Sequence, residues 1–166
     1  MIKNLFNLKK VKIWVIGVMI FYILLSYELC YFLRFAKSET QSHYLYFYAV
    51  FSQLFIYAFL YMALRDIKVY LFIFIIGVLH LSLFFILKEN ASLIGLKNNI
   101  VISLRNTIIL LIIFKFFQFV SLKTQNQELV SIGRNNKDFY RTRNVTRVDY
   151  ILEIIYITAT FILLIK

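Results

Sequence analysis

The 166-residue chain has no proline, four glycines, one cysteine and two histidines. With no proline and so little glycine, its helices have few encoded breaks. Alternating-access transporters build their substrate sites from helices that glycine or proline interrupts, and backbone-carbonyl selectivity filters require non-helical backbone. The composition therefore argues against both of these architectures.

The same scarcity limits the chemistry of the chain. Cys30 has no second cysteine with which to form an internal disulfide, and His43 and His80 lie too far apart in sequence to suggest a histidine-rich metal cluster. Neither the serine-hydrolase elbow, nor the zinc-protease helix motif, nor a phosphate-binding glycine loop occurs. We therefore predict no metal, no cofactor and no enzymatic activity.

Long apolar runs make up most of the sequence, which is 61% hydrophobic. A hydrocarbon core ~30 Å thick is crossed by about 20 helical residues, and a backbone in lipid must form its own hydrogen bonds. These runs predict an all-α polytopic bundle that forms one integral membrane domain over residues 1–166. The five expected membrane helices are Ile13–Leu33, Tyr44–Leu64, Val69–Leu87, Ile100–Val120 and Tyr150–Ile165.

The first and the last of these runs need separate comment. Ile13–Leu33 follows a basic start and is longer than the apolar core of a secretory signal, which favours an uncleaved anchor. Tyr150–Ile165 has only 16 residues, or ~24 Å of helix. It either crosses by thinning the bilayer or starting earlier, or inserts only partly or against a partner.

The formal net charge of +11 predicts an orientation. If five helices cross, twelve of the 19 Lys and Arg residues lie on the side of the N-terminus and five on the other side. Basic loops remain in the cytoplasm, so we expect the N-terminus inside and the C-terminus outside. Size and composition favour a bacterial cytoplasmic membrane. We assign the charge to topology and anionic lipid headgroups and expect no nucleic-acid partner.

The longest expected loop, Ser121–Asp149, is polar and basic. Its basic residues near the last helix suggest a surface that meets anionic lipid headgroups or a cytosolic partner. The residues proposed for this surface are Arg134, Lys137, Arg141, Arg143 and Arg147.

Five ionisable residues fall within the apolar runs. Counting 1.5 Å per residue from the expected ends places Glu28, His80 and Arg105 in the outer leaflet, where we expect a charge cluster. The same count places Lys115 and Glu153 in the inner leaflet, where we expect an ion pair. Ionisable side chains in a membrane are costly and usually pair or face a cavity.

Three interpretations of these charges remain open. They fix the helix order as buried pairs, they form a proton or ion path, or they meet another chain. Gly17 and Glu28 are eleven residues apart and face the same way, as in a helix–helix contact.

We therefore expect a small non-catalytic membrane subunit or scaffold, associated with other membrane subunits or with itself. One alternative is a proton- or ion-conducting homo-oligomer that uses Glu28, His80 and Arg105. The other is a membrane-disrupting effector.

Overall fold

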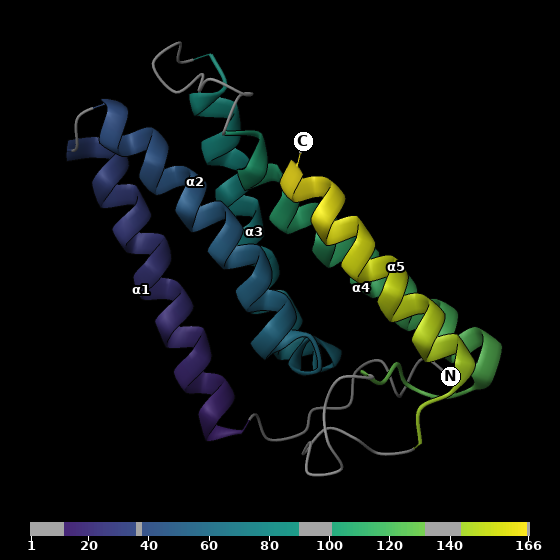
Figure 1. Cartoon of the computed structure of the whole chain (residues 1–166). Coiled ribbons are helices and arrows are strands. Elements are labelled where there is room, and N and C mark those ends of the chain that lie inside the picture. Colours follow the sequence, from purple (N-terminus) through teal and green to yellow (C-terminus); the bar gives the residue numbers. More distant parts are fainter. Residues whose placement is uncertain (1–11, 36–37, 90–100, 132–143, 166) are drawn as a thin grey trace.

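A computed structural model gives the fold of residues 12–35, 38–89, 101–131 and 144–165 (Figure 1). These residues are mostly helical and contain no β-strand. The described α-helices are α1 (Ile13–Phe35), α2 (Ser38–Phe55), α3 (Ile67–Leu87), α4 (Ile102–Gln125) and α5 (Arg147–Ile165). The predicted all-helical class is therefore confirmed.

Four helical segments are long and apolar enough to cross a membrane, so the protein is membrane-embedded. They are Ile13–Phe35, His43–Leu60, Ile67–Leu87 and Ile102–Gln125. Helix α5 is not one of these four, and its first two turns carry Arg147, Asp149 and Glu153. A fifth crossing and the orientation of the bundle remain predictions.

The helices extend beyond several of the expected ends. Helix α4 continues past Val120 through a polar segment to Gln125, and it ends at Asn126 in the left-handed conformation, with φ 51°. Helix α5 begins at Arg147, ahead of its apolar run. Hydropathy marks the part of a helix that suits lipid, whereas hydrogen bonding and capping decide where the helix ends.

The connection between α2 and α3 also differs from the expected single helix over 44–64. Helix α2 ends at Phe55 and continues as a π-helical segment, η2 (Ile56–Leu60), then a 3-10 turn, η3 (Ala63–Arg65). Asp66 then begins α3, because its carboxylate accepts a hydrogen bond from the backbone N–H of Lys68 at 2.9 Å.

Helix α4 occupies the centre of the arrangement, because it packs against α2, α3 and α5. Helix α1 packs on α2 and η2 at one side of the bundle, and Figure 1 shows α1 and α5 on opposite sides. Only 17% of the most apolar 18-residue stretch of α1 is buried within the chain. The outward face of α1 is therefore available to lipid or to another protein.

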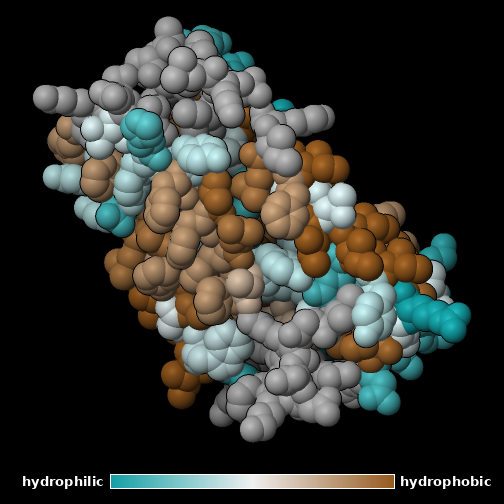
Figure 2. All heavy atoms as spheres, viewed as in Figure 1, coloured by the Kyte–Doolittle hydropathy of each residue, from teal (hydrophilic) through white to brown (hydrophobic). Residues whose placement is uncertain are grey.

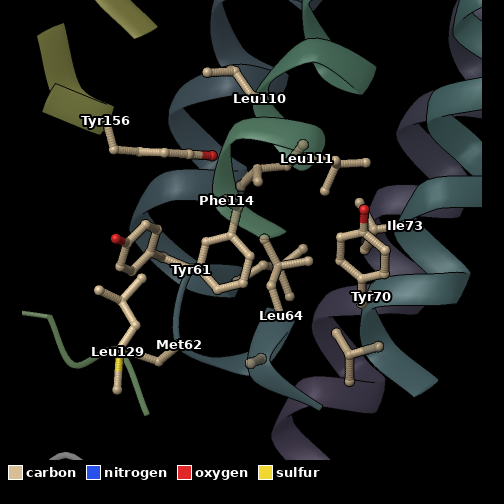
Figure 3. Close-up of a cluster of buried hydrophobic side chains, with 14 of the residues drawn as sticks. Tyr61, Met62, Leu64, Tyr70, Ile73, Leu110, Leu111, Phe114, Leu129 and Tyr156 are labelled. Carbon is tan, nitrogen blue, oxygen red and sulfur yellow. The ribbon is translucent and has the colours of Figure 1, made fainter. Parts of the chain in front are cut away.

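Two apolar clusters fill the interior. The larger surrounds the α2–α3 corner, where the Tyr61 ring lies 5.0 Å from the rings of both Phe114 and Tyr156 (Figure 3). The smaller lies toward the other end of the bundle and joins Leu29 of α1 to Leu104 of α4.

The exposed surface carries many large apolar side chains. Figure 2 shows apolar side chains over the middle of one face, with hydrophilic residues mostly nearer its ends. Large exposed apolar residues occur on all five α-helices, among them Leu24, Phe47, Leu79, Phe116 and Ile154. A surface of this kind suits hydrocarbon, whereas in water it would drive aggregation.

Candidate functional site

A chain of side-chain hydrogen bonds crosses the bundle and links four helices. The Tyr48 hydroxyl of α2 lies 2.8 Å from Ser26 Oγ of α1 and 2.7 Å from His80 Nε2 of α3. The other ring nitrogen, His80 Nδ1, lies 3.3 Å from Thr107 Oγ1 of α4. We call Ser26, Tyr48, His80 and Thr107 the cross-bundle network.

The cross-bundle network lies in the interior. His80 and Thr107 are each 1% exposed, and Tyr48 is 3% exposed. Tyr22 of α1 is fully buried beside it, with its ring 6.2 Å from the His80 ring. Its hydroxyl has no hydrogen-bond partner of normal geometry in the part of the chain described. Apart from Ser26, which is partly exposed, the network is therefore enclosed within the apolar bundle.

Gly77 explains why α3 and α4 approach closely here. A Cβ atom at Gly77 would lie 3.3 Å from Leu111 Cδ1 and 3.7 Å from Thr107 Cγ2. Gly77 is one helical turn before His80, so the close approach occurs beside the His80–Thr107 contact. The missing side chain lets the imidazole reach α4.

The contacts of His80 suit a neutral imidazole. A neutral ring has one N–H donor and one acceptor nitrogen, and a hydroxyl can donate or accept. Ser26 Oγ donates to the Tyr22 carbonyl at 2.9 Å, so the Tyr48 hydroxyl donates to Ser26. The Tyr48 hydroxyl therefore accepts from His80 Nε2–H, while the Thr107 hydroxyl donates to Nδ1. Buried polar groups that are fully hydrogen-bonded make a packing arrangement specific. The network is suited to fixing the mutual position of four helices.

The expected cluster of Glu28, His80 and Arg105 is not assembled within one chain. Glu28 is exposed on α1, beside the hydroxyl of Tyr44. The Arg105 guanidinium lies over the Phe84 ring, 5.9 Å from its centroid, and its Nε is buried without a hydrogen-bond partner. Depth along the membrane can be counted from sequence, but the direction in which each helix faces depends on packing.

The expected Lys115–Glu153 pair is not formed either. The Lys115 ammonium donates to Gln118 Oε1 at 2.7 Å and lies 4.7 Å from the centroid of the Tyr70 ring. The expectation placed Lys115 and Glu153 together by depth alone. In the structure Lys115 instead uses neighbours on its own helix and on α3.

Glu153 lies in a different polar setting. Its carboxylate, 1% exposed, accepts hydrogen bonds from Tyr57 at 2.9 Å and Ser131 at 2.8 Å. Tyr61 is nearby at the α2–α3 corner, where burial and then the Glu153 charge raise the pKa of its phenol. The two hydroxyl donors stabilise the buried carboxylate. They also connect α5 to η2, through Tyr57, and to the segment after α4, through Ser131.

A second buried carboxylate organises the start of α5. The backbone N–H of Thr146 donates to Asp149 Oδ2 at 2.9 Å, and the N–H of Asp149 donates to Thr146 Oγ1 at 3.4 Å. Asp149 Oδ1 also accepts from Gln125 Nε2 at 3.1 Å and from the N–H of Val130 at 3.4 Å. This reciprocal capping box ties α5 to α4 and to the segment between them.

The Arg65–Glu128 ion pair joins η3 to the segment after α4. The Arg65 side chain is only 7% exposed. It reinforces the same end of the bundle as the Asp149 capping box.

Most of the expected basic surface lies outside the described residues, namely Arg134, Lys137, Arg141 and Arg143. Arg147 is described and lies exposed at the first residue of α5.

Sequence reasoning identified His80 as important but missed its partners. Ser26, Tyr48 and Thr107 lie on three other helices, and isolated hydroxyls in apolar runs are usually bonded to their own helix. Thr146-x-x-Asp149 was detectable as a capping-box pattern. Among the described residues, no group of three or more metal-ligating side chains lies close enough to hold a metal.

No protein-family model, curated protein sequence or solved structure matches this chain. Its function is therefore argued from the residues and contacts above.

Proposed function

We propose that this protein is a small non-catalytic subunit or scaffold of a larger membrane assembly. The observation that carries the proposal is the exposure of Glu28 on α1. Glu28 lies seven residues before the last residue of α1, or ~10 Å along the helix. An ionisable side chain facing lipid costs about 2.5–3.5 kcal/mol at the centre of a membrane helix on insertion scales, and less toward the helix end. Another protein surface would remove this cost.

The cross-bundle network supports a scaffold role. It joins α1, α2, α3 and α4 through side chains that lie within the bundle. Interhelical hydrogen bonds in membranes are worth about 0.6 kcal/mol each on average, and three in series oppose sliding of any one helix. A bundle fixed in this way presents constant outer faces to its partners.

Proton conduction receives less support. A conducting path must run along the membrane normal, whereas the cross-bundle network runs from helix to helix. Ser26 lies nine residues before the end of α1, His80 seven before the end of α3, and Thr107 five after the start of α4. These positions share one level, so their hydrogen bonds run across the bundle rather than through it.

We also propose that α5 makes a fifth crossing, with the N-terminus in the cytoplasm and the C-terminus outside a bacterial-type cytoplasmic membrane. The charge asymmetry of the whole sequence supports this orientation. Exposed apolar residues on α5, including Ile151, Ile155 and Ile162, suit contact with lipid. Arg147 and the basic residues before it would then meet anionic lipid headgroups.

Purification from native membranes in a mild detergent tests the subunit proposal. We expect the tagged chain to migrate well above its 19.9 kDa mass plus detergent and to carry other membrane chains or further copies of itself. A protein that purifies alone as a monomer would contradict the proposal. Reconstitution of the pure chain in liposomes is the complementary test, because proton flux abolished by His80→Phe would favour conduction.

A further inference from the structure

We propose that two copies of this chain bind each other through Glu28 of one copy and Arg105 of the next. The inference rests on the proposed role as a membrane subunit and names one partner, a second copy. Glu28 and Arg105 have opposite charges and lie within the membrane-spanning helices α1 and α4. Among the described residues, neither forms an ion pair within its own chain.

The two residues occupy the same level of the bundle. Glu28 lies two residues after Ser26 in α1, Arg105 lies two residues before Thr107 in α4, and the cross-bundle network joins Ser26 to Thr107. Two copies with the same orientation in the membrane therefore bring Glu28 and Arg105 to the same depth. Within one copy Glu28 is exposed on α1, whereas Arg105 is partly buried on α4 with its guanidinium over Phe84.

Each charge continues into an exposed stripe along its helix. At 100° per residue, one stripe of α1 contains Gly17, Leu24, Glu28, Tyr31 and Phe35, all exposed. We call it the α1 face. The corresponding stripe of α4 contains Arg105 with the exposed residues Ile112, Phe116 and Phe119. We call it the α4 face.

Gly17 is a second, independent feature of the α1 face. A Cβ atom there would have no atom of the chain within 4 Å, in contrast to Gly77, where α3 and α4 meet. Small residues on membrane helices let another helix approach closely. Nothing in the described part of the chain uses the space at Gly17, whereas a second copy would.

The environment of Arg105 leaves its charge without a carboxylate partner among the described residues of its own chain. Its Nε is buried and unpaired, and its guanidinium lies over the Phe84 ring at the junction of α3 and α4. The residue as a whole is partly exposed, and a carboxylate binds a guanidinium with two parallel hydrogen bonds. A symmetric contact between two α1 faces would instead place Glu28 against Glu28. The charges therefore favour a head-to-tail contact of the α1 face with the α4 face.

Disulfide trapping in native membranes tests this contact. Cys30→Ser removes the native thiol, after which Glu28→Cys is introduced into one tagged copy and Arg105→Cys into a second, differently tagged copy. Oxidation is expected to give a reducible band that contains both tags. Copies that carry only one of these cysteines should not cross-link to themselves. Glu28→Cys combined with Ile162→Cys is the matched control, because Asn106 donates to the Leu163 carbonyl at 2.7 Å, which places exposed Ile162 near the same level on α5.

Charge exchange supplies the second measurement. Glu28→Arg should remove most of the co-purification of differently tagged copies, and adding Arg105→Glu to the same chain should restore it. The proposal is overturned if Glu28→Cys and Arg105→Cys do not cross-link, if they cross-link no better than the Ile162 control, or if charge exchange fails to restore association. If other membrane chains still co-purify in that case, the subunit proposal stands and only the self-association is wrong.

Discussion

At the scale of single residues, the protein separates its intramembrane polar groups into two kinds. His80 is enclosed and bonded on both ring nitrogens, whereas Glu28 faces outward without a cation in the described part of its own chain. A fully bonded interior group stabilises the fold that encloses it. An exposed charge in lipid instead favours association, because its cost falls when a partner covers it.

Tyr48→Phe tests the cross-bundle network at its central residue. The substitution removes one hydroxyl that contacts both Ser26 and His80, so we expect a loss of about 1 kcal/mol in the free energy of unfolding. Unfolding in mixed detergent and SDS micelles measures this change. Tyr46→Phe is the control, because Tyr46 is 56% exposed and its loss should have little effect. Equal effects of the two substitutions would contradict the assigned role of Tyr48.

At the scale of helices, the two intramembrane glycines serve different contacts. Gly77 lies where α3 and α4 approach closely, and Gly17 lies on the open face of α1. Gly77 therefore allows two helices of the chain to pack closely, whereas Gly17 leaves an open surface on α1. Sequence alone shows both glycines in similar apolar runs.

Valine at each glycine distinguishes these roles. Gly77→Val should push α3 from α4 and lower the free energy of unfolding by about 1–3 kcal/mol, the usual cost of overpacking. Gly17→Val should leave the unfolding of the isolated chain nearly unchanged, since its Cβ enters open space. It should still weaken the proposed self-association. A stability loss at Gly17 as large as that at Gly77 would show that α1 packs differently.

The start of α5 offers another test at this scale. Asp149→Ala removes the acceptor for Thr146, Gln125 and Val130, and we expect it to destabilise the protein by about 1–2 kcal/mol. Limited proteolysis should then cut faster between α4 and α5. Asp66→Ala is the matched control, since that carboxylate caps α3 from a partly exposed position. Its effect should be smaller.

At the scale of the whole molecule, the number of crossings decides which faces meet which compartment. Four segments have the length and apolarity to cross, and α5 carries acidic residues at its start. Asp149 is buried in the capping box and Glu153 is bonded by two hydroxyls, so these carboxylates do not face lipid. Their burial removes the main objection to α5 as a membrane helix.

Reporter fusions at both ends determine the topology. With five crossings, a periplasmic reporter such as alkaline phosphatase should be active after Lys166, and a cytoplasmic fluorescent reporter should be active ahead of Met1. A fusion in the segment between α4 and α5 should report the cytoplasm. If both termini prove cytoplasmic, α5 does not cross, and the expected outside C-terminus is wrong.

The sequence by itself determined the lipid surroundings of the chain, its helical class and the approximate positions of its helices. In hydrocarbon a long apolar run must form its own backbone hydrogen bonds, and of the regular structures only a helix does so within one segment. It also determined which residues are costly there, including Glu28, His80 and Arg105. Only the tertiary structure decided their neighbours. Rotation of each helix about its axis is set by packing such as the Gly77 contact, and that rotation placed His80 against Tyr48 and Thr107 while it left Glu28 on the outer surface.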